Sequence, residues 1–334
     1  MYQQFVGIDI ASETAACFWE TSQGQKQKLE IPQSSKAYQS LAKDLLKNVS
    51  ASRSLVVMEA TGNYWLRLAL FLHQQGFPVA VLNPSHFYHF ALSERRRAKT
   101  DLLDAELLAR YGRLHQPTAW TPPPAIFYAL QQRLSLREDL QNDRVRNLNR
   151  LHALRQVPKA ETLVLARLER QIQQLEADIQ ALETEIRSLL NSEHEWSQSA
   201  RRLLTIKGIG LITTAWLLTA TQNFSRCQSP EEAAAYAGLA PYAHDSGKKH
   251  GKRLTGGGHP QLRKMLYMAA GAALRFNPPL RAFYQRLVQR GKIKQVARIA
   301  VARKLLHMAW ACVVKERDFD PNFGRQSAIA SFSA

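Results

Sequence analysis

The sequence predicts an α/β domain at its amino end, followed by a mostly helical chain. Three observations predict this division. Five short apolar runs of strand length fall within the first 85 residues, helical periodicity begins after the third run, and nearly all of the positive charge lies in the last 134 residues. The chain has 334 residues, a length typical of about two domains.

The first 115 residues alternate between strand-like and helix-like segments. Three strands in close succession, at 5–11, 15–21 and 27–32, favour an antiparallel meander. The remaining expected elements are a helix at 35–49, a strand at 54–61, a helix at 61–76, a strand at 78–84 and a helix at 100–112. Hairpin strands followed by parallel strands with crossover helices are typical of a ribonuclease H-like fold.

A proline-rich stretch at 115–125 is the expected end of this domain, and a long polar helix at 126–155 follows it. Beyond Pro158 an apolar seam steps by three and four residues through Leu165, Leu168, Ile172, Leu175, Ile179, Leu182, Ile186 and Leu189. The seam is about 37 Å long at ~1.5 Å per residue. We interpret it as an intermolecular coiled coil that makes a dimer; the alternative is a hairpin with 126–155 of the same chain.

The last part of the chain is predicted to be helical. Two helices flank a Gly-Ile-Gly turn within 200–224, a helix-hairpin-helix pattern, and three basic amphipathic helices follow. From Asp318 on we expect a loose tail. The predicted division of the chain is therefore 1–115, 116–200, 201–317 and 318–334.

The charge distribution points to a polyanion partner. The formal charge is +18, and the last 134 residues hold 22 basic and 6 acidic residues. Since neutralised phosphates release counterions, nucleic acid explains this asymmetry better than a merely basic surface. No apolar run approaches the ~20 residues of a membrane span, and the first residues do not resemble a signal peptide. Three cysteines far apart in sequence favour neither disulfides nor a zinc site, so we expect a cytoplasmic protein, associated with the nucleoid when it acts.

Four acidic residues are candidate metal ligands. Asp9 lies inside an apolar strand, where an unpaired carboxylate costs several kcal/mol. Glu59 ends the fourth strand, which neighbours the first in the expected fold. Asp101 and Asp104 share one face at the start of a helix. Each acid alone is explained as surface or first-turn charge, but together they favour Mg²⁺ or Mn²⁺, two ions of which assist phosphoryl transfer.

A cationic, glycine-rich loop at 241–259 carries a candidate nucleophile, Ser246. A hydroxyl among cations is placed to attack a phosphate, although a Ser-Gly pair by itself usually marks a turn. Tyr242 is the rival nucleophile. The surrounding cations are Lys248, Lys249, Lys252 and Arg253, and the nearby His244, His250 and His259 are expected to contact phosphates.

Two further segments are candidate nucleic-acid contacts. The turn containing Lys207, Gly208 and Gly210 either presents backbone N–H groups to a phosphate or simply connects two helices. A basic run before Asp101 either lines the nucleic acid at the metal site or is a solvated charge run; its members are Arg95, Arg96, Arg97 and Lys99.

Seven segments together resemble the DEDD-type insertion-sequence transposases, the family that includes the Piv DNA invertase and the bridge-RNA-guided recombinases. The first half contributes FVGIDIA, MEATGNYW, VLNPSHFYHF and RAKTDLLDAELLA. The second half contributes LTIKGIGLITTAWLL, AAYAGLAPYAHDSGKKHGK and PQLRKMLYMAA, the last of which includes Arg263, a further expected nucleic-acid contact. The resemblance runs from about residue 5 to residue 315.

The resemblance implies a RuvC-like first domain that binds Mg²⁺ through Asp9, Glu59, Asp101 and Asp104. It implies a transposase domain in which Ser246, by motif position, attacks DNA and forms a covalent intermediate. It also implies that a dimer or dimer of dimers recombines double-stranded DNA selected by a noncoding guide RNA. The sequence departs from the family pattern at 254–258, LTGGG, where a Ser-Lys or Lys-Arg pair is usual, so the cation that contacts the phosphate there stays open.

Three other functions stay open at the level of sequence. A RuvC-like nuclease or junction resolvase would use the carboxylates and water without a serine nucleophile. A nucleic-acid-binding protein without activity would have no use for Asp9 in an apolar strand. An invertase that acts at fixed sites without RNA would share the chemistry of the guided recombinase.

Overall fold

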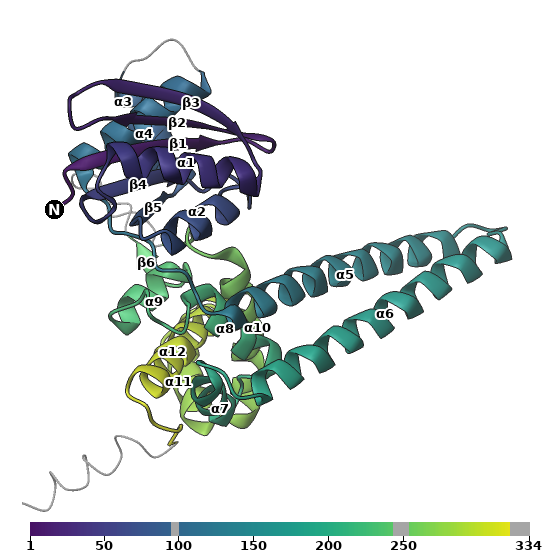
Figure 1. The fold of residues 1–334 in the computed structure, drawn as a ribbon. Coiled ribbons are helices and arrows are strands. Elements are labelled where there is room, and N and C mark those ends of the chain that lie inside the picture. Colours follow the sequence, from purple (N-terminus) through teal and green to yellow (C-terminus); the bar gives the residue numbers. More distant parts are fainter. Residues whose placement is uncertain (95–99, 243–253, 321–334) are drawn as a thin grey trace, which may run out of the picture. The chain divides into compact units, whose positions relative to one another are not determined.

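The computed structural model describes residues 1–94, 100–242 and 254–320, and the chain divides into two compact units, Met1–Pro122 and Pro123–Ala334 (Figure 1). The boundary falls within the predicted proline-rich stretch at 115–125. The predicted middle part, 116–200, is not a compact unit of its own, because its helices share an apolar core with the helices that follow it.

The first unit contains a five-stranded mixed sheet. Its strands are β1 (Gln4–Ile10), β2 (Thr14–Glu20), β3 (Lys26–Pro32), β4 (Ser54–Glu59) and β5 (Val79–Leu82), and the sheet order is β3-β2-β1-β4-β5. Strand β2 is antiparallel to β1 and β3, whereas β4 is parallel to β1 and β5. All five predicted strands, and the meander formed by the first three, are confirmed.

Helices cover both faces of this sheet: α1 (Ser35–Asn48), α2 (Trp65–Gln74), α3 (Pro84–Ser93) and α4 (Asp101–His115), with a short 3₁₀ turn, η1, at Ala51–Arg53. Helices α1 and α2 pack on the face that carries Val6 and Ile8, and α4 packs on the face that carries Phe5 and Val57. Because β1 is buried on both faces, its sequence is apolar at nearly every position. Helix α3 was not predicted.

The second unit is helical apart from a small ribbon. Its elements are α5 (Ala125–Arg155), α6 (Thr162–Asn191), α7 (Ser197–Thr205), α8 (Leu211–Thr221), α9 (Pro230–Tyr236), β6 (Pro241–Tyr242), β7 (Leu254–Thr255), α10 (Pro260–Phe276), α11 (Pro278–Gln289) and α12 (Lys294–Val314). The two helices that flank the Gly-Ile-Gly turn and the three later basic helices are as predicted. None of the described helices is long and apolar enough to cross a bilayer.

Helices α5 and α6 form an antiparallel hairpin within one chain (Figure 1). Ion pairs join Arg137 to Glu183 at 2.6 Å, Arg144 to Glu176 at 2.6 Å and Arg155 to Glu169 at 2.7 Å, so the numbering rises along α5 as it falls along α6. All eight seam positions predicted on α6 are buried or half-buried in the single chain. The seam therefore packs against α5, so the alternative hairpin within one chain accounts for its apolar period, and a coiled coil between chains stays a prediction.

Candidate active site

Two of the predicted carboxylates lie side by side on neighbouring parallel strands. The register of β1 and β4 pairs Ile8 with Met58, and Asp9 and Glu59 are the next residues on each strand. Side chains alternate between the faces of a sheet, so Asp9 shares the face of Phe5, and Glu59 shares the face of Val57. Both acids therefore stand on the face covered by α4. The first and fourth strands are neighbours, as predicted.

Helix α4 carries the other two carboxylates in its first turn. The Thr100 hydroxyl accepts a hydrogen bond from the Leu103 N–H at 3.3 Å, which fixes the start of the helix as the sequence predicts. Asp101 and Asp104 lie in the first turn of α4. The residues that pack directly on β1, starting at Ala105, come in the next turn. The helix thus directs both acids toward the end of β1 at which Asp9 stands.

Gly7 lets helix α4 approach β1 closely, a positioning role that the sequence did not predict. A Cβ atom at this position would lie 1.9 Å from the Ala105 carbonyl oxygen and 2.5 Å from the Ala109 nitrogen. The backbone of α4 therefore rests directly on β1, two residues before Asp9. The available signal was a glycine inside an otherwise apolar strand, which often marks a close approach of another backbone.

The four acids influence one another electrostatically. The pKa of Asp9 is raised from 3.8 to about 6, first by burial and then by the negative charges of Asp104, Asp101 and Glu59. The backbone hydrogen bond at Ile10 only partly opposes this rise. Thr61 donates a hydrogen bond to Glu59 Oε1 at 3.3 Å. The structure thus brings together the four carboxylates that the sequence singled out, with Asp9 at the centre of their repulsion.

The donor chemistry and the charge of this cluster fit a divalent cation. In the described parts of the chain, no three His, Cys, Asp or Glu side chains stand close enough, as oriented, to hold a metal ion. The cluster offers only carboxylate oxygens, the ligands preferred by hard cations, and a cation between them would remove the repulsion that raises the pKa of Asp9.

The loop that carries the predicted nucleophile is described only at its two ends. Strands β6 and β7 pair Pro241 with Thr255 and Tyr242 with Leu254, so the chain enters and leaves the segment 243–253 at one place. Tyr242 is 44% exposed. The predicted residues that lie outside the described ones are Ser246, Lys248, Lys249, Lys252, Arg253, His244, His250, Arg95, Arg96, Arg97 and Lys99.

His259 and Arg263 hold the base of this loop in the described structure. The His259 N–H donates to the Tyr236 carbonyl oxygen at 2.8 Å, its Nδ1 accepts from the Leu262 N–H at 3.2 Å, and burial lowers its pKa. Arg263 donates to the Gly257 carbonyl oxygen. A cation thus reaches the glycine turn at 256–258 from α10. Contact of either residue with a phosphate stays a prediction.

The Gly-Ile-Gly turn has a clear packing role. Gly208 has φ +111°, and a Cβ atom there would lie 2.5 Å from the Ala273 Cβ on α10. Lys207 is exposed, and its carbonyl oxygen accepts a hydrogen bond from Asn277 at 3.3 Å. Gly210 precedes α8 with open space around it. Close packing against α10 explains why position 208 is a glycine. Phosphate binding by Lys207 and Gly210 stays a prediction.

A pair of substitutions separates these two roles. We expect Gly208→Ala to lower the free energy of unfolding by about 2–4 kcal/mol, because the residue needs positive φ and has no room for a methyl group. Gly210→Ala, whose φ is −102°, is the matched control and should change stability by less than about 1 kcal/mol. Urea unfolding of the two variants measures both values. Equal stability of the two variants would contradict the packing role.

Comparison with known proteins relates both units to transposases. Residues 6–157 match the transposase family model DEDD_Tnp_IS110, and residues 200–285 match the transposase IS116/IS110/IS902 family. The pilin gene-inverting protein of Moraxella bovis is 33% identical over 333 residues, covering 96% of this chain and 98% of that protein. Its counterpart in Moraxella lacunata is 32% identical with the same coverage. The transposase for insertion sequence element IS1328 of Yersinia enterocolitica is 26% identical over 73% of this chain.

Proposed function

The chain belongs to the IS116/IS110/IS902 family of transposases, and from this premise we propose that it cuts and rejoins double-stranded DNA with Ser246 as nucleophile and a metal-binding carboxylate site. The family implies a DNA recombinase that depends on a divalent metal. The observation that carries the proposal is the convergence of Asp9, Glu59, Asp101 and Asp104 at one end of β1 and β4. The sheet order β3-β2-β1-β4-β5 supports a ribonuclease H-like, RuvC-like assignment of the first unit.

Asp9, Glu59, Asp101 and Asp104 are the proposed ligands of Mg²⁺ or Mn²⁺. When bound, the ion supplies positive charge to the oxygens of the reacting phosphate. The strands fix two of these acids and the first turn of α4 fixes the other two, so the protein holds the set on rigid elements. Asp9, half-buried and central, keeps the cluster in a partly water-excluded place where such charge interactions are strong.

Ser246 is proposed to act by exchange of ester bonds. Its oxygen forms a bond to phosphorus, the bond from phosphorus to one deoxyribose oxygen breaks, and that oxygen leaves with a proton as a free hydroxyl. Attack of another DNA hydroxyl on the phosphoserine then reseals a strand and returns the serine, with no net hydrolysis. The paired ends of the 243–253 loop, fixed by β6 and β7, support a defined position for its base.

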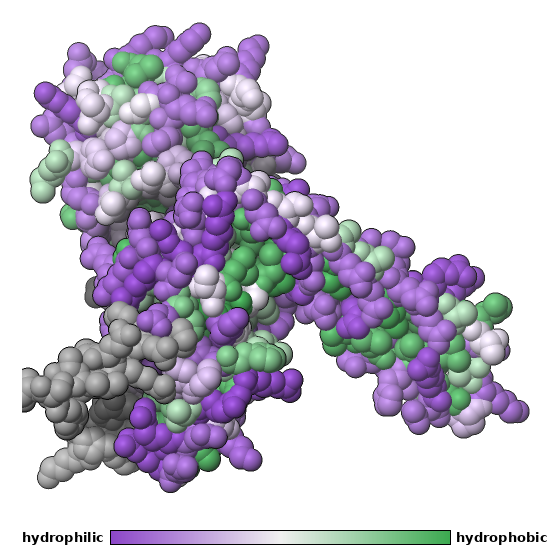
Figure 2. Space-filling model, turned by 90° about the horizontal axis from the view of Figure 1, so that it is seen from below, coloured by the Kyte–Doolittle hydropathy of each residue, from purple (hydrophilic) through white to green (hydrophobic). Residues whose placement is uncertain are grey.

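The partners proposed for this reaction are the DNA of the element ends and target, a noncoding guide RNA and further copies of the chain. The excess of 22 basic over 6 acidic residues after residue 200 supports binding of nucleic acid. At the tip of the hairpin Val157, Leu163 and Val164 are 50%, 73% and 46% exposed. Figure 2 shows hydrophobic side chains along the hairpin, between hydrophilic flanks, which supports a dimer or dimer of dimers.

The test is to trap the covalent intermediate. The wild-type chain, its flanking noncoding RNA, Mg²⁺ and a labelled duplex carrying the element junction are incubated and then denatured. We expect a protein–DNA adduct with wild type and with the matched control Tyr242→Phe, and a reduction of at least about 1,000-fold with Ser246→Ala, because the nucleophile itself is removed.

Two outcomes would overturn the serine assignment. An adduct that is absent in Tyr242→Phe and retained in Ser246→Ala would make Tyr242 the nucleophile. Free DNA ends without an adduct, unaffected by Ser246→Ala and abolished by Asp9→Asn, would identify a hydrolytic nuclease or junction resolvase instead.

Inversion of a DNA segment is a second candidate function. It is favoured by the coverage of the relatives, because the pilin gene-inverting proteins match 96% of the chain and the IS1328 transposase 73%. A plasmid with two inverted junctions, assayed with and without the flanking RNA, separates the candidates. Efficient inversion without RNA would favour an invertase that acts at fixed sites.

A further inference from the structure

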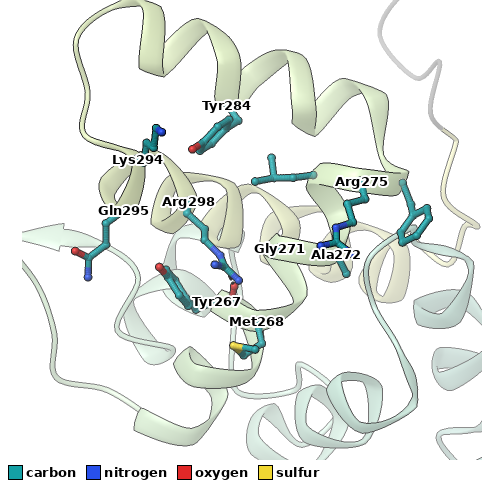
Figure 3. A pocket seen from close by; sticks show the side chains of 11 residues that line it. Tyr267, Met268, Gly271, Ala272, Arg275, Tyr284, Lys294, Gln295 and Arg298 are labelled. Atoms are coloured by element: carbon teal, nitrogen blue, oxygen red, sulfur yellow. Dashed lines mark hydrogen bonds between the residues drawn. The ribbon is translucent and has the colours of Figure 1, made fainter.

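A groove of about 790 Å³ opens along α10 and the start of α12, with α11 at its edge (Figure 3). It lies in the second unit, and all of its lining residues are in the described part of the chain. Its wall combines cations, aromatic rings and an amide, and contains no acidic residue. The lining side chains that matter most are Tyr267, Arg275, Tyr284, Lys294, Gln295 and Arg298.

Arg298 is held in a fixed position in this groove. Its guanidinium lies 4.2 Å from the centroid of the Tyr267 ring, and its Nε donates to the Tyr267 carbonyl oxygen at 3.1 Å. Gly271 makes room for it, since a Cβ atom there would lie 2.4 Å from Arg298 Nη2. Figure 3 shows Arg298 beside Tyr267. Stacking of this kind fixes the plane of the guanidinium and leaves its terminal nitrogens as donors for an anion.

The cations of the groove differ from those of the hairpin in their ion pairs. Among the described residues, no acidic side chain forms an ion pair with Arg275, Lys294 or Arg298. In the hairpin, by contrast, Arg137, Arg144 and Arg155 are each paired with a glutamate. Three cations around one groove without acidic partners repel one another, and an anionic ligand removes that repulsion.

Aromatic surface accompanies this positive charge. Tyr284 lies on the opposite wall close to Lys294 (Figure 3), and Phe276 at the rim is 65% exposed. An exposed aromatic face beside cations suits a ligand with both a planar ring and a phosphate. In a duplex the bases are stacked on one another, so their faces cannot reach these rings, whereas the bases of an unpaired strand can.

We propose that this groove binds unpaired nucleotides of a nucleic-acid strand, with Arg275, Lys294 and Arg298 on the phosphates and Tyr284 and Phe276 stacked on the bases. The proposal builds on the proposed recombination, because exchange of strands exposes unpaired nucleotides. DNA and RNA strands share this chemistry, and the experiment below distinguishes them.

The test measures binding of fluorescent 12-nucleotide probes to the full chain by anisotropy. The probes are a single-stranded DNA, an RNA of the same sequence, a DNA duplex and an abasic DNA strand. Measurements are made in EDTA, so that binding is followed without DNA cleavage. Arg275→Ala/Lys294→Ala removes two exposed groove cations, and Arg290→Ala/Lys292→Ala removes two exposed cations outside the lining as the matched control of equal charge.

We expect the groove double variant to bind single strands at least about tenfold more weakly, and the control variant to change Kd by less than about threefold. The slope of log Kd against log salt concentration should fall by about 0.7 for each phosphate that the groove variant no longer neutralises. Abasic DNA should bind wild type about tenfold more weakly than intact DNA, and Tyr284→Ala should remove most of that difference. Tight binding of the DNA probe, the RNA probe or both identifies the source of the strand.

Three results would overturn the proposal: equal weakening in the two double variants, duplex binding as tight as single-strand binding, or equal binding of abasic and intact strands. A polyglutamate peptide that binds through the same cations, while the strands do not, would also overturn it in favour of an acidic protein partner.

Arg298→Lys keeps the positive charge but removes the stacking of a planar guanidinium on the Tyr267 ring. We expect this variant to bind single strands more weakly while its melting temperature stays unchanged. Normal strand binding without adducts in the trapping assay would count against the serine mechanism alone.

Discussion

Asp9→Asn is expected to abolish DNA cleavage and, in EDTA, to make the protein more stable. The folded protein raises the pKa of Asp9 to about 6, above the ordinary value of 3.8 that holds in the unfolded chain. Ionised Asp9 therefore destabilises the fold at neutral pH. The full shift corresponds to about 3 kcal/mol, which we reduce to about 1–2 kcal/mol because Asp9 is partly exposed to solvent. Asparagine has the same shape without the charge.

The pH dependence has a definite sign. A raised carboxyl pKa gives stability that is present below the unfolded pKa and is lost as pH rises through the folded pKa, here between about 4 and 6. The stability difference between Asp9→Asn and wild type should thus be largest at pH 7 and shrink toward pH 4. Urea unfolding at several pH values measures it, and Glu13→Gln, an exposed acid in the turn after β1, is the control.

With a divalent metal present, wild type should become more stable than Asp9→Asn. Added Mg²⁺ stabilises wild type by binding only the folded state, and Asp9→Asn, which lacks a central ligand, should gain little. Recombination and adduct formation by Asp9→Asn should fall by at least about 1,000-fold. A variant that is less stable than wild type in EDTA, or equally stabilised by Mg²⁺, would contradict the carboxylate site.

Gly7→Ala is expected to destabilise the first unit more than the addition of a single methyl group at any other position. The added Cβ would meet the backbone oxygen of Ala105 at 1.9 Å, and a backbone atom inside a packed helix cannot turn aside. Helix α4 must move away from β1, which we expect to lower the free energy of unfolding by about 3–5 kcal/mol. The movement also separates Asp101 and Asp104 from Asp9, and a displacement of about 1 Å can reduce activity ~100-fold.

Gly112→Ala is the graded control on the same helix. A Cβ there would meet Val57 Cγ2 at 2.7 Å and Phe5 Cδ1 at 3.0 Å, which are side-chain atoms that can shift. We expect a destabilisation of about 1–2 kcal/mol and nearly normal activity of the folded fraction. Hydrogen exchange of the β1 amides and urea unfolding measure both variants. A larger destabilisation in Gly112→Ala than in Gly7→Ala would contradict the close packing of α4 on β1.

The strands of the first unit could be predicted because each is a short apolar run bounded by polar turns. Their order along the chain then placed Asp9 beside Glu59, and the Thr100 cap placed Asp101 and Asp104 in a first helical turn. Helix α3 was missed because it buries only Phe87 and so shows no apolar face with a helical period, and helix α9 because seven residues are too few to establish one. Their starts still carry signals, since Asn83 and Ser229 cap them and a proline follows each.

The partner of the α6 seam could not be predicted from its period. A heptad pattern shows that one face is buried but does not identify the helix that covers it. The deciding information lies in α5, whose Arg137, Arg144 and Arg155 face glutamates on α6 in antiparallel order. For the groove on α10 the same limit holds, because Gly271 and Arg298 meet only after α10 and α12 have packed together.

The boundary after Pro122 has a consequence for damaged copies of the gene. A premature stop there would leave every strand of the five-stranded sheet and all four carboxylates in the product, yet only +3 of the +18 formal charge. Such a fragment would have neither the proposed serine nor much attraction to DNA. If the proposed mechanism holds, we therefore expect truncation at this point to give a product that forms no covalent adduct with DNA.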